Sequence, residues 1–398
     1  MKQVLIISQH FPPEKSGNAS RISDMSTHLH TFGSEITVLA PHPTFPTGTF
    51  ERVWKPSSHE DVNGVNAVHL WTWQPTAKDP GFVSRMFYYL IFPVHASLWI
   101  LTHSRNFDLI ITSSPPIFTH IPGRVAKTLF HKEWIMDIRD LWIDASVSLG
   151  FLKKGSIAEK MSRAFERRCL EKTDQITVTT SELGERISSD NAIQNKIVRI
   201  SNGVNTAFFK PSSQPKKNQI VYAGNIGYAQ DLELVIRAMK IISEKYPLKF
   251  IIAGAGDIKE HLEDVVKSEG LEEIVLFPGT IPREAVPQLI AESLIGVAPL
   301  KDIPTLEYAA PTKVYEYMAC GTPFVGCGKG EISRIANGSG GGIIADNTPE
   351  AIATTILDLV HDPAKRETMA RSGREYVVNN FDRGAIAAKL NKIIEADR

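Results

Sequence analysis

The feature that most constrains the fold is a repeated alternation of short apolar runs with longer segments of helical periodicity. The apolar runs span only four or five residues, as in Val4–Ser8, Ile36–Ala40 and Leu109–Thr112. Runs of this length are typical of parallel strands that are covered by helices on both faces. The alternation therefore predicts an α/β protein built from doubly wound parallel sheets.

The alternation occurs in two series. The first series ends near residue 200, and the second begins near residue 218 with the run Ile220–Ala223. Between them, Phe208–Asn218 is polar and contains prolines, as linkers often are. A chain of 398 residues is also long for a single core. We therefore predict two domains, with the first covering residues 1–207 and the second beginning at residue 208.

Charge and cysteine content exclude some classes of protein. Lys plus Arg number 44 and Asp plus Glu number 44, so there is no basic surplus for binding nucleic acid. The three cysteines lack the spacing of a disulfide framework or a zinc site. The N-terminal run Val4–Ile7 is too short for the core of a signal peptide. We expect a cytoplasmic protein without a metal site.

Two segments interrupt the α/β alternation. Met86–Ser104 contains no Asp, Glu, Lys or Arg over nineteen residues, and Gly150–Lys172 is basic and amphipathic. Between Gly150 and Arg168 there are six Lys or Arg residues against two Glu. Such a pair of segments suits peripheral contact with an anionic membrane. A buried helix followed by a solvated helix face explains the pattern equally well, so both interpretations stay open.

Glycine-bearing loops follow three of the predicted strands. We expect Asn18 to cap the helix that begins after Gly17, and Gly33 to end it. The loops of the second domain contain Gly224 with Asn225, and Gly254 with Gly256 and Asp257. Free N–H groups at a strand-to-helix turn favour anions. None of the loops carries the full GxGxxG pattern, so plain turns are an alternative.

The densest cluster of functional residue types lies between Pro311 and Pro323. Thr312 is expected to cap a helix whose first N–H groups can hold a phosphate, with Lys313 adding a positive charge. Glu316, one turn further on, can accept two hydrogen bonds from a diol such as ribose. A capped helix with a surface glutamate is the simpler alternative.

Three charged residues, Asp137, Arg139 and Asp140, end a predicted buried strand of the first domain. Charges at such a position are costly unless they are paired or used for binding. They are candidates for positioning the substrate, and paired ions that support a loop are the alternative.

Together, these segments resemble the family 4 glycosyltransferases of GT-B fold over nearly the whole chain. The resemblance is carried by His10–Arg21, Arg139–Trp142, Ser201–Phe208, Tyr222–Gly227, Gly254–Asp257, Phe277–Arg283 and Glu316–Pro323. The segment Lys313–Val325 is the most specific, because it looks like the nucleotide-sugar segment of the family with its E-x-M-A-x-G-x-P end. The sequence as a whole looks like that of the branch of the family that builds bacterial O-antigen, capsule or exopolysaccharide.

The resemblance implies two Rossmann-like domains that face a cleft. The first domain, 1–207, would bind the acceptor and be completed by a C-terminal helix at about 378–398, and 208–377 would bind the nucleotide-sugar donor. The resemblance further implies transfer with retention of the anomeric configuration and no cofactor or metal. UDP-sugars are favoured over GDP-sugars, and the acceptor is expected to be a glycan or a polyprenyl-linked glycan.

Site residues carry over by position. Glu316 would bind the donor ribose, Gly17 would lie near the diphosphate, and Gly254–Asp257 would lie near the base. The expected donor-binding set is Gly17, Asn18, Arg21, Gly224, Asn225, Gly254, Gly256, Asp257, Arg283, Thr312, Lys313 and Glu316. The expected catalytic set is Asp137, Arg139, Asp140 and Lys313.

The chain departs from the pattern of the family at several positions. The first Glu of the E-x7-E pair is replaced by Tyr308, with Glu307 one residue too early, and a frequent histidine is replaced by Arg139. The Arg and Lys that usually hold the diphosphate appear as Asn225 and Gln230. We therefore expect Lys313, helped by Arg283 or Arg21, to supply the missing positive charge.

Other functions remain possible on the sequence alone. A UDP-sugar 2-epimerase can share the GT-B architecture, and the weakened acidic pair also allows a non-catalytic scaffold of a polysaccharide complex. A Rossmann dehydrogenase is disfavoured, because the GxGxxG pattern with a downstream acid is missing.

Overall fold

The computed structural model describes residues 1–14, 16–45, 48–77, 81–148, 150–188 and 190–396. The chain divides into two compact units. Unit 1 contains Met1–Ser201 and Gly384–Arg398, and unit 2 contains Asn202–Arg383. The junctions differ by six residues from the predicted boundaries at 207 and 377.

Unit 1 is built on a sheet of eight strands within the described residues, in the order β3-β4-β2-β1-β5-β6-β7-β8. Only β3 runs antiparallel to its neighbour. The strands are β1 (Gln3–Ser8), β2 (Glu35–Pro41), β3 (Ser57–Val62), β4 (Val65–Leu70), β5 (Leu109–Ser114), β6 (Glu133–Ile138), β7 (Gln175–Val178) and β8 (Ile197–Arg199). The helices are α1 (Gly17–Thr31), α2 (Phe82–His103), α3 (His120–Phe130), α4 (Trp142–Ser148), α5 (Ile157–Lys172), α6 (Ser181–Ile187), α7 (Asn191–Gln194) and α15 (Arg383–Glu395), with short 3-10 turns at Ser104–Asn106 and Ile117–Thr119.

Alternating side chains of the central strand β1 explain why helices cover both faces of this sheet. Val4 and Ile6 point to one face, where they pack with residues of α1 and α15 such as Leu29 and Leu390. Leu5 and Ile7 point to the other face, where residues of α2 and α3 cover them. Residues buried on both faces produce the continuous apolar runs seen in the sequence.

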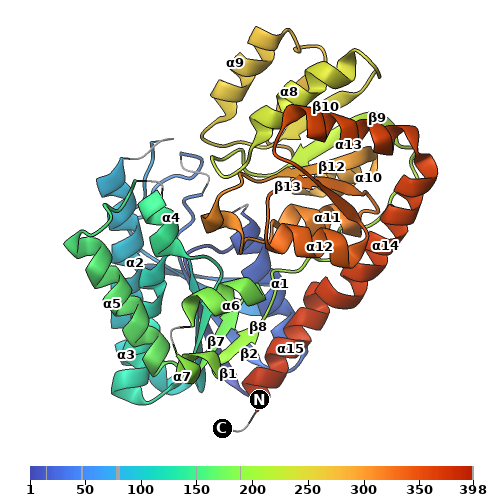
Figure 1. Cartoon of the computed structure of the whole chain (residues 1–398). Helices are drawn as coiled ribbons and strands as arrows, with labels where there is room; N and C mark the ends of the chain where they lie inside the picture. Colours follow the sequence, from blue (N-terminus) through green and yellow to red (C-terminus); the bar gives the residue numbers. More distant parts are fainter. Residues whose placement is uncertain (15, 46–47, 78–80, 149, 189, 397–398) are drawn as a thin grey trace. The chain divides into compact units, whose positions relative to one another are not determined.

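Unit 2 contains a fully parallel sheet, which has six strands in the described residues and the order β11-β10-β9-β12-β13-β14. Its strands are β9 (Lys217–Ala223), β10 (Lys249–Ala253), β11 (Val275–Gly279), β12 (Ser293–Pro299), β13 (Phe324–Cys327) and β14 (Gly342–Ala345). Its helices are α8 (Leu232–Ser243), α9 (Lys259–Glu269), α10 (Val286–Ala291), α11 (Thr312–Ala319), α12 (Glu331–Ser339), α13 (Pro349–His361) and α14 (Pro363–Phe381), with 3-10 turns at Arg283–Ala285 and Pro304–Leu306 (Figure 1). Helices α8, α9 and α13 cover one face. Helices α10, α11, α12 and α14 cover the other.

Most predicted elements are present, and the differences lie in caps, breaks and edges. The helix after β1 is capped by Ser16, whose Oγ accepts a hydrogen bond from the Ala19 N–H, and not by Asn18 as predicted. The predicted end at Gly33 is confirmed, since this glycine has φ +97°. The C-terminal helix predicted at about 378–398 begins at Arg383 as α15, and Asp382 separates it from α14.

The hairpin of β3 and β4 was not predicted. Its first strand, Ser57–Val62, reads SSHEDV and is mostly exposed, so it lacks the apolar run that marks the buried strands. Edge strands need no such run, because only one side of them is paired and covered.

Candidate functional site

The strongest candidate site lies in unit 2, at the carboxyl ends of β9 and β12. These two strands are neighbours, and the chain continues from β9 toward β10 on one side and from β12 toward β13 on the other. Such a reversal of strand order opens a crevice where α/β proteins bind ligands. The loop after β9 begins at Gly224, and α11 follows β12 with Lys313 in its first turn.

Lys313 is the central side chain of this site. It is partly buried, and its Nζ donates a hydrogen bond of 3.2 Å to Oε1 of Gln230. The same ammonium lies 4.8 Å from the centroid of the Tyr222 ring. Within the described part of the chain, Lys313 forms no ion pair, although the negative charge of Glu316 acts on it from a distance. Burial lowers the pKa of Lys313 to about 8. A desolvated ammonium held only by an amide and an aromatic ring is suited to receive an anion.

Glu316 lies one turn further along α11 and is also partly buried. Burial raises the pKa of its carboxyl, while the positive charges of Arg383, Lys313 and Arg283 act in the opposite direction. Arg283 itself lies over the ring of Phe208, at 5.2 Å from the ring centroid. The structure thus places the predicted residues Lys313 and Arg283 close enough to Glu316 for their positive charges to act on its carboxyl group.

Thr312 does not cap α11 as predicted. It is the first helical residue, and the capping position is occupied by Pro311, which makes no side-chain hydrogen bond to the helix. Proline has no side-chain acceptor for the free N–H groups at this end of the helix.

The loops after β9 and β10 contact each other through their backbones. A Cβ on Gly254 would lie 1.9 Å from the carbonyl oxygen of Gly224, and one on Gly256 would lie 2.3 Å from that of Ile226. Hydrogen bonds join the loops, from the N–H of Gly224 to the Ala253 oxygen and from the N–H of Ile226 to the Ala255 oxygen. Gly254 and Gly256 are therefore required for packing, whatever else they do.

Asn225 and Asp257 belong to the same pair of loops. The carbonyl oxygen of Asn225 accepts a hydrogen bond from the Tyr222 hydroxyl. This bond fixes the loop after β9 beside the Tyr222 ring, over which the ammonium of Lys313 lies. Asp257 is exposed to solvent. The expected roles of both residues in donor binding stay predictions.

In unit 1, Asp137 lies at the centre of a buried hydrogen-bond network. Arg21 donates to both of its carboxylate oxygens, at 2.7 and 3.1 Å, and Ser113 and Thr177 donate at 2.7 and 2.9 Å. Burial alone would raise the pKa of Asp137, but the charges of Arg21 and Arg139 and these hydrogen bonds hold it below its ordinary value. The geometry favours the alternative of paired ions, because Arg21 and Asp137 form a buried ion pair with two hydrogen bonds.

Arg139 is held close to the start of α1. Its Nε donates to the Ser114 carbonyl oxygen at 3.0 Å, and its Nη1 donates to Oδ1 of Asn18 at 2.6 Å. Burial lowers the pKa of Arg139 to about 10. Gly17 has open space around the position of a Cβ. Gly17, Asn18 and Arg139 thus lie together at the carboxyl edge of the sheet, whereas Asp140 makes other interactions of its own.

Tyr308, which replaces the first acid of the E-x7-E pair, is buried. The carbonyl oxygen of the neighbouring Glu307 accepts a hydrogen bond of 2.7 Å from the N–H of Glu331. A Cβ on Gly330 would lie 2.0 Å from that oxygen, and Gly330 has φ +75°, so only glycine fits there. The backbone of Glu307 therefore supports the start of α12.

Sequence reasoning did not point to one further place, a pocket of unit 1 beside the β3–β4 hairpin. Its residues are scattered between positions 13 and 69 and form no motif. Trp54 stands out only in the structure, where it is an exposed tryptophan.

Comparisons with known proteins agree with this architecture. Residues 16–203 match the glycosyl transferase 4-like domain, and residues 204–376 match the glycosyl transferases group 1. An uncharacterized glycosyltransferase of Methanocaldococcus jannaschii is 28% identical over 95% of this chain and 92% of its own length. A glycosyl transferase of Escherichia coli K12 named for colanic acid biosynthesis, WcaI, is 26% identical over 69% of this chain and 71% of its own.

Among solved structures, Anabaena HepE in complex with UDP and glucose superposes with a TM-score of 0.73 and 13% identity, with full coverage of both chains. At this identity the similarity shows the fold alone. Two α/β units with parallel sheets, two adjoining matches to glycosyltransferase models and relatives named as glycosyltransferases lead to one conclusion. The chain belongs to the family 4 glycosyltransferases of GT-B fold.

Proposed function

We propose that this enzyme transfers a sugar, with retention, from a nucleotide-diphosphate sugar to a glycan or lipid-linked acceptor in surface polysaccharide biosynthesis. UDP-sugars are the favoured donors, and no metal ion takes part. The observation that carries the proposal is Lys313, an unpaired ammonium among the described residues, at the strand-order reversal of unit 2. The relative named for colanic acid biosynthesis supports the choice of pathway class.

In the proposed reaction, the bond between the anomeric carbon and the diphosphate oxygen breaks, and a bond to the acceptor oxygen forms on the same face. The leaving diphosphate gains negative charge, which Lys313 and the free N–H groups at the start of α11 stabilise. The acceptor hydroxyl gives its proton to the leaving phosphate oxygen, so no protein base is needed. Glu316 accepts hydrogen bonds from the ribose hydroxyls.

In this proposal, Lys313 takes the place of the Arg and Lys that usually hold the diphosphate in the family, and Gln230 positions its ammonium group. The amide oxygen of Gln230 holds the ammonium at 3.2 Å, so the positive charge is present although it comes from a different position of the chain. A neutral hydrogen-bond partner leaves the full charge available to a diphosphate, whereas a carboxylate partner would cancel it.

A thermal-shift screen with UDP, GDP and their sugars tests the proposal. UDP is expected to raise the Tm of the native protein by mass action, and Lys313→Ala is expected to abolish that shift and to lower kcat about 100-fold. Lys245→Ala, which removes an exposed lysine of unit 2, serves as the matched control. Normal turnover of a folded Lys313→Ala protein would contradict the proposed role.

Two further measurements separate the alternatives. Incubation with UDP-N-acetylglucosamine alone would yield UDP and a 2-epimer if the protein were an epimerase, and should leave the sugar nucleotide unchanged if it is a transferase. Sugar transfer to any acceptor excludes a non-catalytic scaffold.

We also propose that unit 1 rests on an anionic membrane surface, where a lipid-linked acceptor would lie. The outer side of α2 exposes Val83, Phe87, Val94, Leu98 and Leu101, whose spacing places them along one stripe of the helix. The opposite side packs on the sheet through residues such as Phe92 and Ile100. No helix in the described parts of the chain is long and apolar enough to cross a membrane.

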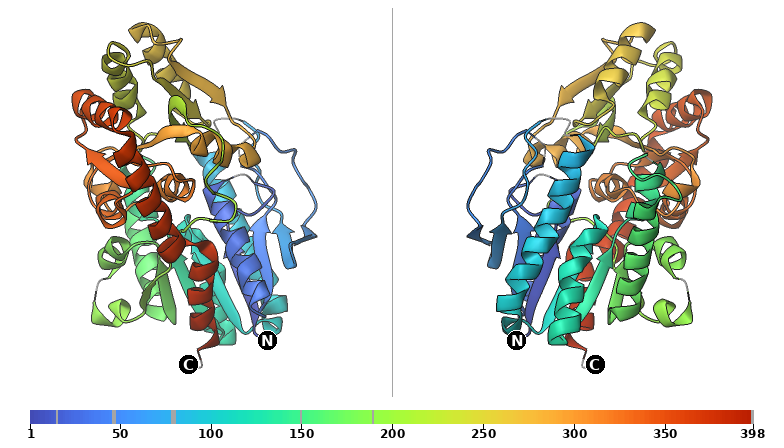
Figure 2. Two further views of the ribbon diagram at one scale, coloured as in Figure 1. Left: turned by 90° about the vertical axis from the view of Figure 1, so that its right-hand side faces the viewer. Right: turned by 90° about the vertical axis from the view of Figure 1, so that its left-hand side faces the viewer.

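Helix α5 and the loop before it supply complementary charge. Helices α2, α3 and α5 stand side by side on one side of unit 1 (Figure 2, right). Ile157 and Met161 are exposed on α5, and exposed Lys153, Lys154 and Lys160 lie near them in the chain. Arg85 of α2 lies 5.8 Å from the ring centroid of Phe151. This contact links α2, which bears the apolar stripe, to the basic segment Gly150–Lys172. Apolar side chains beside basic ones are typical of surfaces that bind anionic lipid.

Vesicle flotation tests this contact. The enzyme is expected to float with phosphatidylglycerol vesicles and much less with phosphatidylcholine vesicles, and Val94→Ser with Leu98→Ser should abolish binding. Val378→Ser, which changes an exposed valine of unit 2, is the control. Equal binding of the double variant and the control would show that α2 does not contact the membrane.

A further inference from the structure

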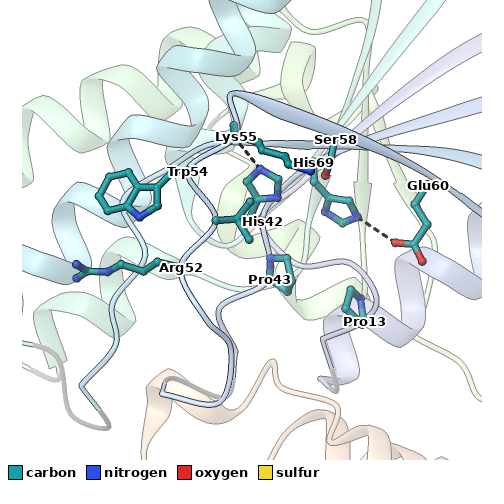
Figure 3. A pocket seen from close by; sticks show the side chains of 10 residues that line it. Pro13, His42, Pro43, Arg52, Trp54, Lys55, Ser58, Glu60 and His69 are labelled. Carbon is teal, nitrogen blue, oxygen red and sulfur yellow. Dashed lines mark hydrogen bonds and ion pairs between the residues drawn. The ribbon is translucent and has the colours of Figure 1, made fainter.

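A pocket of about 750 Å³ lies entirely within unit 1, and none of its lining residues is assigned a step in the reaction described above. It is formed by the segment after β2, the β3–β4 hairpin and the loop after β1. The side chains that matter for its chemistry are His42, Arg52, Trp54, Lys55, Glu60 and His69 (Figure 3). In Figure 3, Arg52 and Trp54 lie at one end of the pocket and Glu60 at the other.

The two buried histidines have fixed hydrogen-bonding roles. Nε2 of His42 lies 3.0 Å from the carbonyl oxygen of Lys55, and Nδ1 of His69 lies 3.1 Å from that of Pro41. Since a carbonyl only accepts, each of these nitrogens carries the proton. The other nitrogen of His69, Nε2, is left as an acceptor in the neutral ring.

Nε2 of His69 has no hydrogen-bond partner among the described residues, although it is buried and His69 is only 4% exposed. The carboxylate of Glu60 lies 3.8 Å from this nitrogen, which is too far for a hydrogen bond (Figure 3). Leaving a buried polar atom unsatisfied is costly. A ligand hydroxyl placed between the two would donate to the imidazole or to the carboxylate and remove that cost.

Trp54 provides a flat apolar surface at the other end. Its side chain is 70% exposed, and its ring stacks against Trp71 with centroids 6.3 Å apart and an angle of 26° between the planes. An exposed tryptophan that is held in place by a second ring is suited to packing against the apolar face of a sugar ring.

Two cations, Arg52 and Lys55, line the pocket, and Arg52 stands at the same end as Trp54 (Figure 3). Arg52 is oriented by a hydrogen bond of 3.1 Å from its Nε to the Gln74 carbonyl oxygen and lies 4.9 Å from the centroid of the Trp73 ring. Neither Arg52 nor Lys55 forms an ion pair with any residue that the structure describes. With Glu60 as the opposing charge, Arg52 and Lys55 leave the pocket with a positive surplus that favours an acidic group on the ligand.

We propose that this pocket binds a saccharide that carries an acidic group, with the sugar ring on Trp54, hydroxyls at His69 and Glu60, and the acid at Arg52 and Lys55. Its role as the acceptor subsite rests on the proposed function, whereas the binding of the saccharide does not. The acidic group is either a carboxylate, as in a uronic acid, or a phosphate, as at the reducing end of a lipid-linked sugar.

Saturation-transfer NMR tests the proposal with methyl β-D-glucuronide, α-D-glucose 1-phosphate and neutral methyl β-D-glucoside. UDP is present throughout, so that sugar phosphates are kept from the donor site. Both acidic sugars are expected to give stronger transfer than the glucoside, and the stronger of the two identifies the acid. Trp54→Ala should reduce transfer at least fivefold, and Arg52→Gln should remove the preference for acidic sugars.

Phe32→Ala, which removes another exposed aromatic ring of unit 1, is the matched control and should bind as the wild type does. Three results would overturn the proposal. They are equal saturation transfer with Trp54→Ala and wild type, equal binding of acidic and neutral sugars, and no saturation transfer to any of the three sugars. The UDP thermal shift of the same proteins separates the two hypotheses. If UDP does not raise the Tm but the saccharide still binds, only the proposed function is refuted. If UDP raises the Tm but no saccharide binds, only the saccharide site is refuted.

Discussion

At the scale of single residues, the candidate site in unit 2 contains the positive charge of Lys313, whose burial lowers the stability of the folded state. Burial lowers the pKa of Lys313 to about 8, well below the ordinary value of a lysine, because the charged form loses solvent. Neither Gln230 nor Tyr222 compensates with a negative charge. Functional sites often retain such unfavourable groups, because the ligand supplies the missing partner.

Replacing Lys313 by methionine is expected to stabilise the protein without ligand. The apolar side chain fills a similar volume and removes the desolvated charge, so the free energy of unfolding at pH 7 should rise by roughly 1–3 kcal/mol. The UDP-induced shift in Tm should disappear at the same time. Urea unfolding of Lys313→Met beside Lys245→Met measures this, and a less stable Lys313→Met protein would refute the account of Lys313 as a costly charge.

The affinity for UDP should depend on pH through the same group. In the proposed function the protonated form of Lys313 binds the diphosphate, so the affinity for UDP is expected to fall as the pH rises through about 8. Above that value the protonated fraction falls about tenfold for each pH unit. Calorimetric titrations between pH 7 and pH 9.5 test this. In Lys313→Arg the guanidinium stays charged over this range, and the loss should be absent; an identical loss in both proteins would assign it to another group.

At the scale of elements, close packing at a few glycines fixes where helices meet the sheet. A Cβ on Gly123 of α3 would lie 2.3 Å from Nε1 of Trp134 and 2.7 Å from Cγ2 of Thr112. Trp134 donates from Nε1 to the Thr112 hydroxyl at 2.8 Å, so the indole cannot move without losing that bond. Helix α3 therefore approaches β5 and β6 closely only because residue 123 has no side chain.

Gly123→Ala should destabilise unit 1 even though alanine is the better helix former. Overpacking at a rigid site costs about 1–3 kcal/mol, which exceeds the gain in helix propensity of about 1 kcal/mol. Gly17→Ala is the matched control, since no atom lies within 4 Å of the Cβ position there. Chemical unfolding of both variants is the measurement, and a Gly123→Ala protein as stable as the control would show that α3 shifts freely.

At the scale of the whole molecule, the stability of unit 1 is linked to pH through a buried histidine. His120 of α3 is buried, and its Nδ1 lies 2.7 Å from the Thr112 hydroxyl oxygen, which also accepts a hydrogen bond from Nε1 of Trp134. Burial lowers the pKa of His120 to about 3, against 6.5 for a free histidine. The folded state therefore keeps this ring neutral where the unfolded chain takes up a proton.

The stability that His120 contributes is complete above pH 6.5 and is lost progressively as the pH falls toward 3. Each pH unit in that window should lower the free energy of unfolding by about 1.4 kcal/mol. His120→Gln cannot titrate and should show a smaller slope, although it is less stable at pH 7. Urea unfolding at pH 7, 6 and 5 tests this, and equal slopes for both proteins would refute the assignment.

Much of the fold follows from local patterns, and the errors have physical causes. The strands with continuous apolar runs and the amphipathic helices lie close to the predicted ranges. Asn18 was mistaken for the cap of α1, because Ser16 and Asn18 are equally good capping residues and only the backbone path distinguishes them. The β3 edge strand was missed for lack of an apolar run.

The candidate site was predictable in part. Lys313, Glu316 and the glycine loops could be selected because a cation, an acid and strand-to-helix glycines occur at predicted helix starts, and because Glu316–Pro323 resembles a motif of the family. Asp137 and Arg21 are separated by 116 residues, and no local pattern shows that they satisfy each other in a buried pair. The polar pocket around His69 likewise joins segments that share no motif.

By itself, the sequence determined the two α/β units, the resemblance to the family and the choice of Lys313 as a candidate residue, because burial on both faces of a sheet and short strand-to-helix loops produce recognisable local patterns. Only the tertiary structure decided which of these charges are paired with an opposite charge and which are not. Lys313 lies against Gln230 and Tyr222, while Arg21 lies against Asp137. Pairing depends on distances between segments that are remote in the chain, and these distances are fixed only when both faces of each sheet are packed.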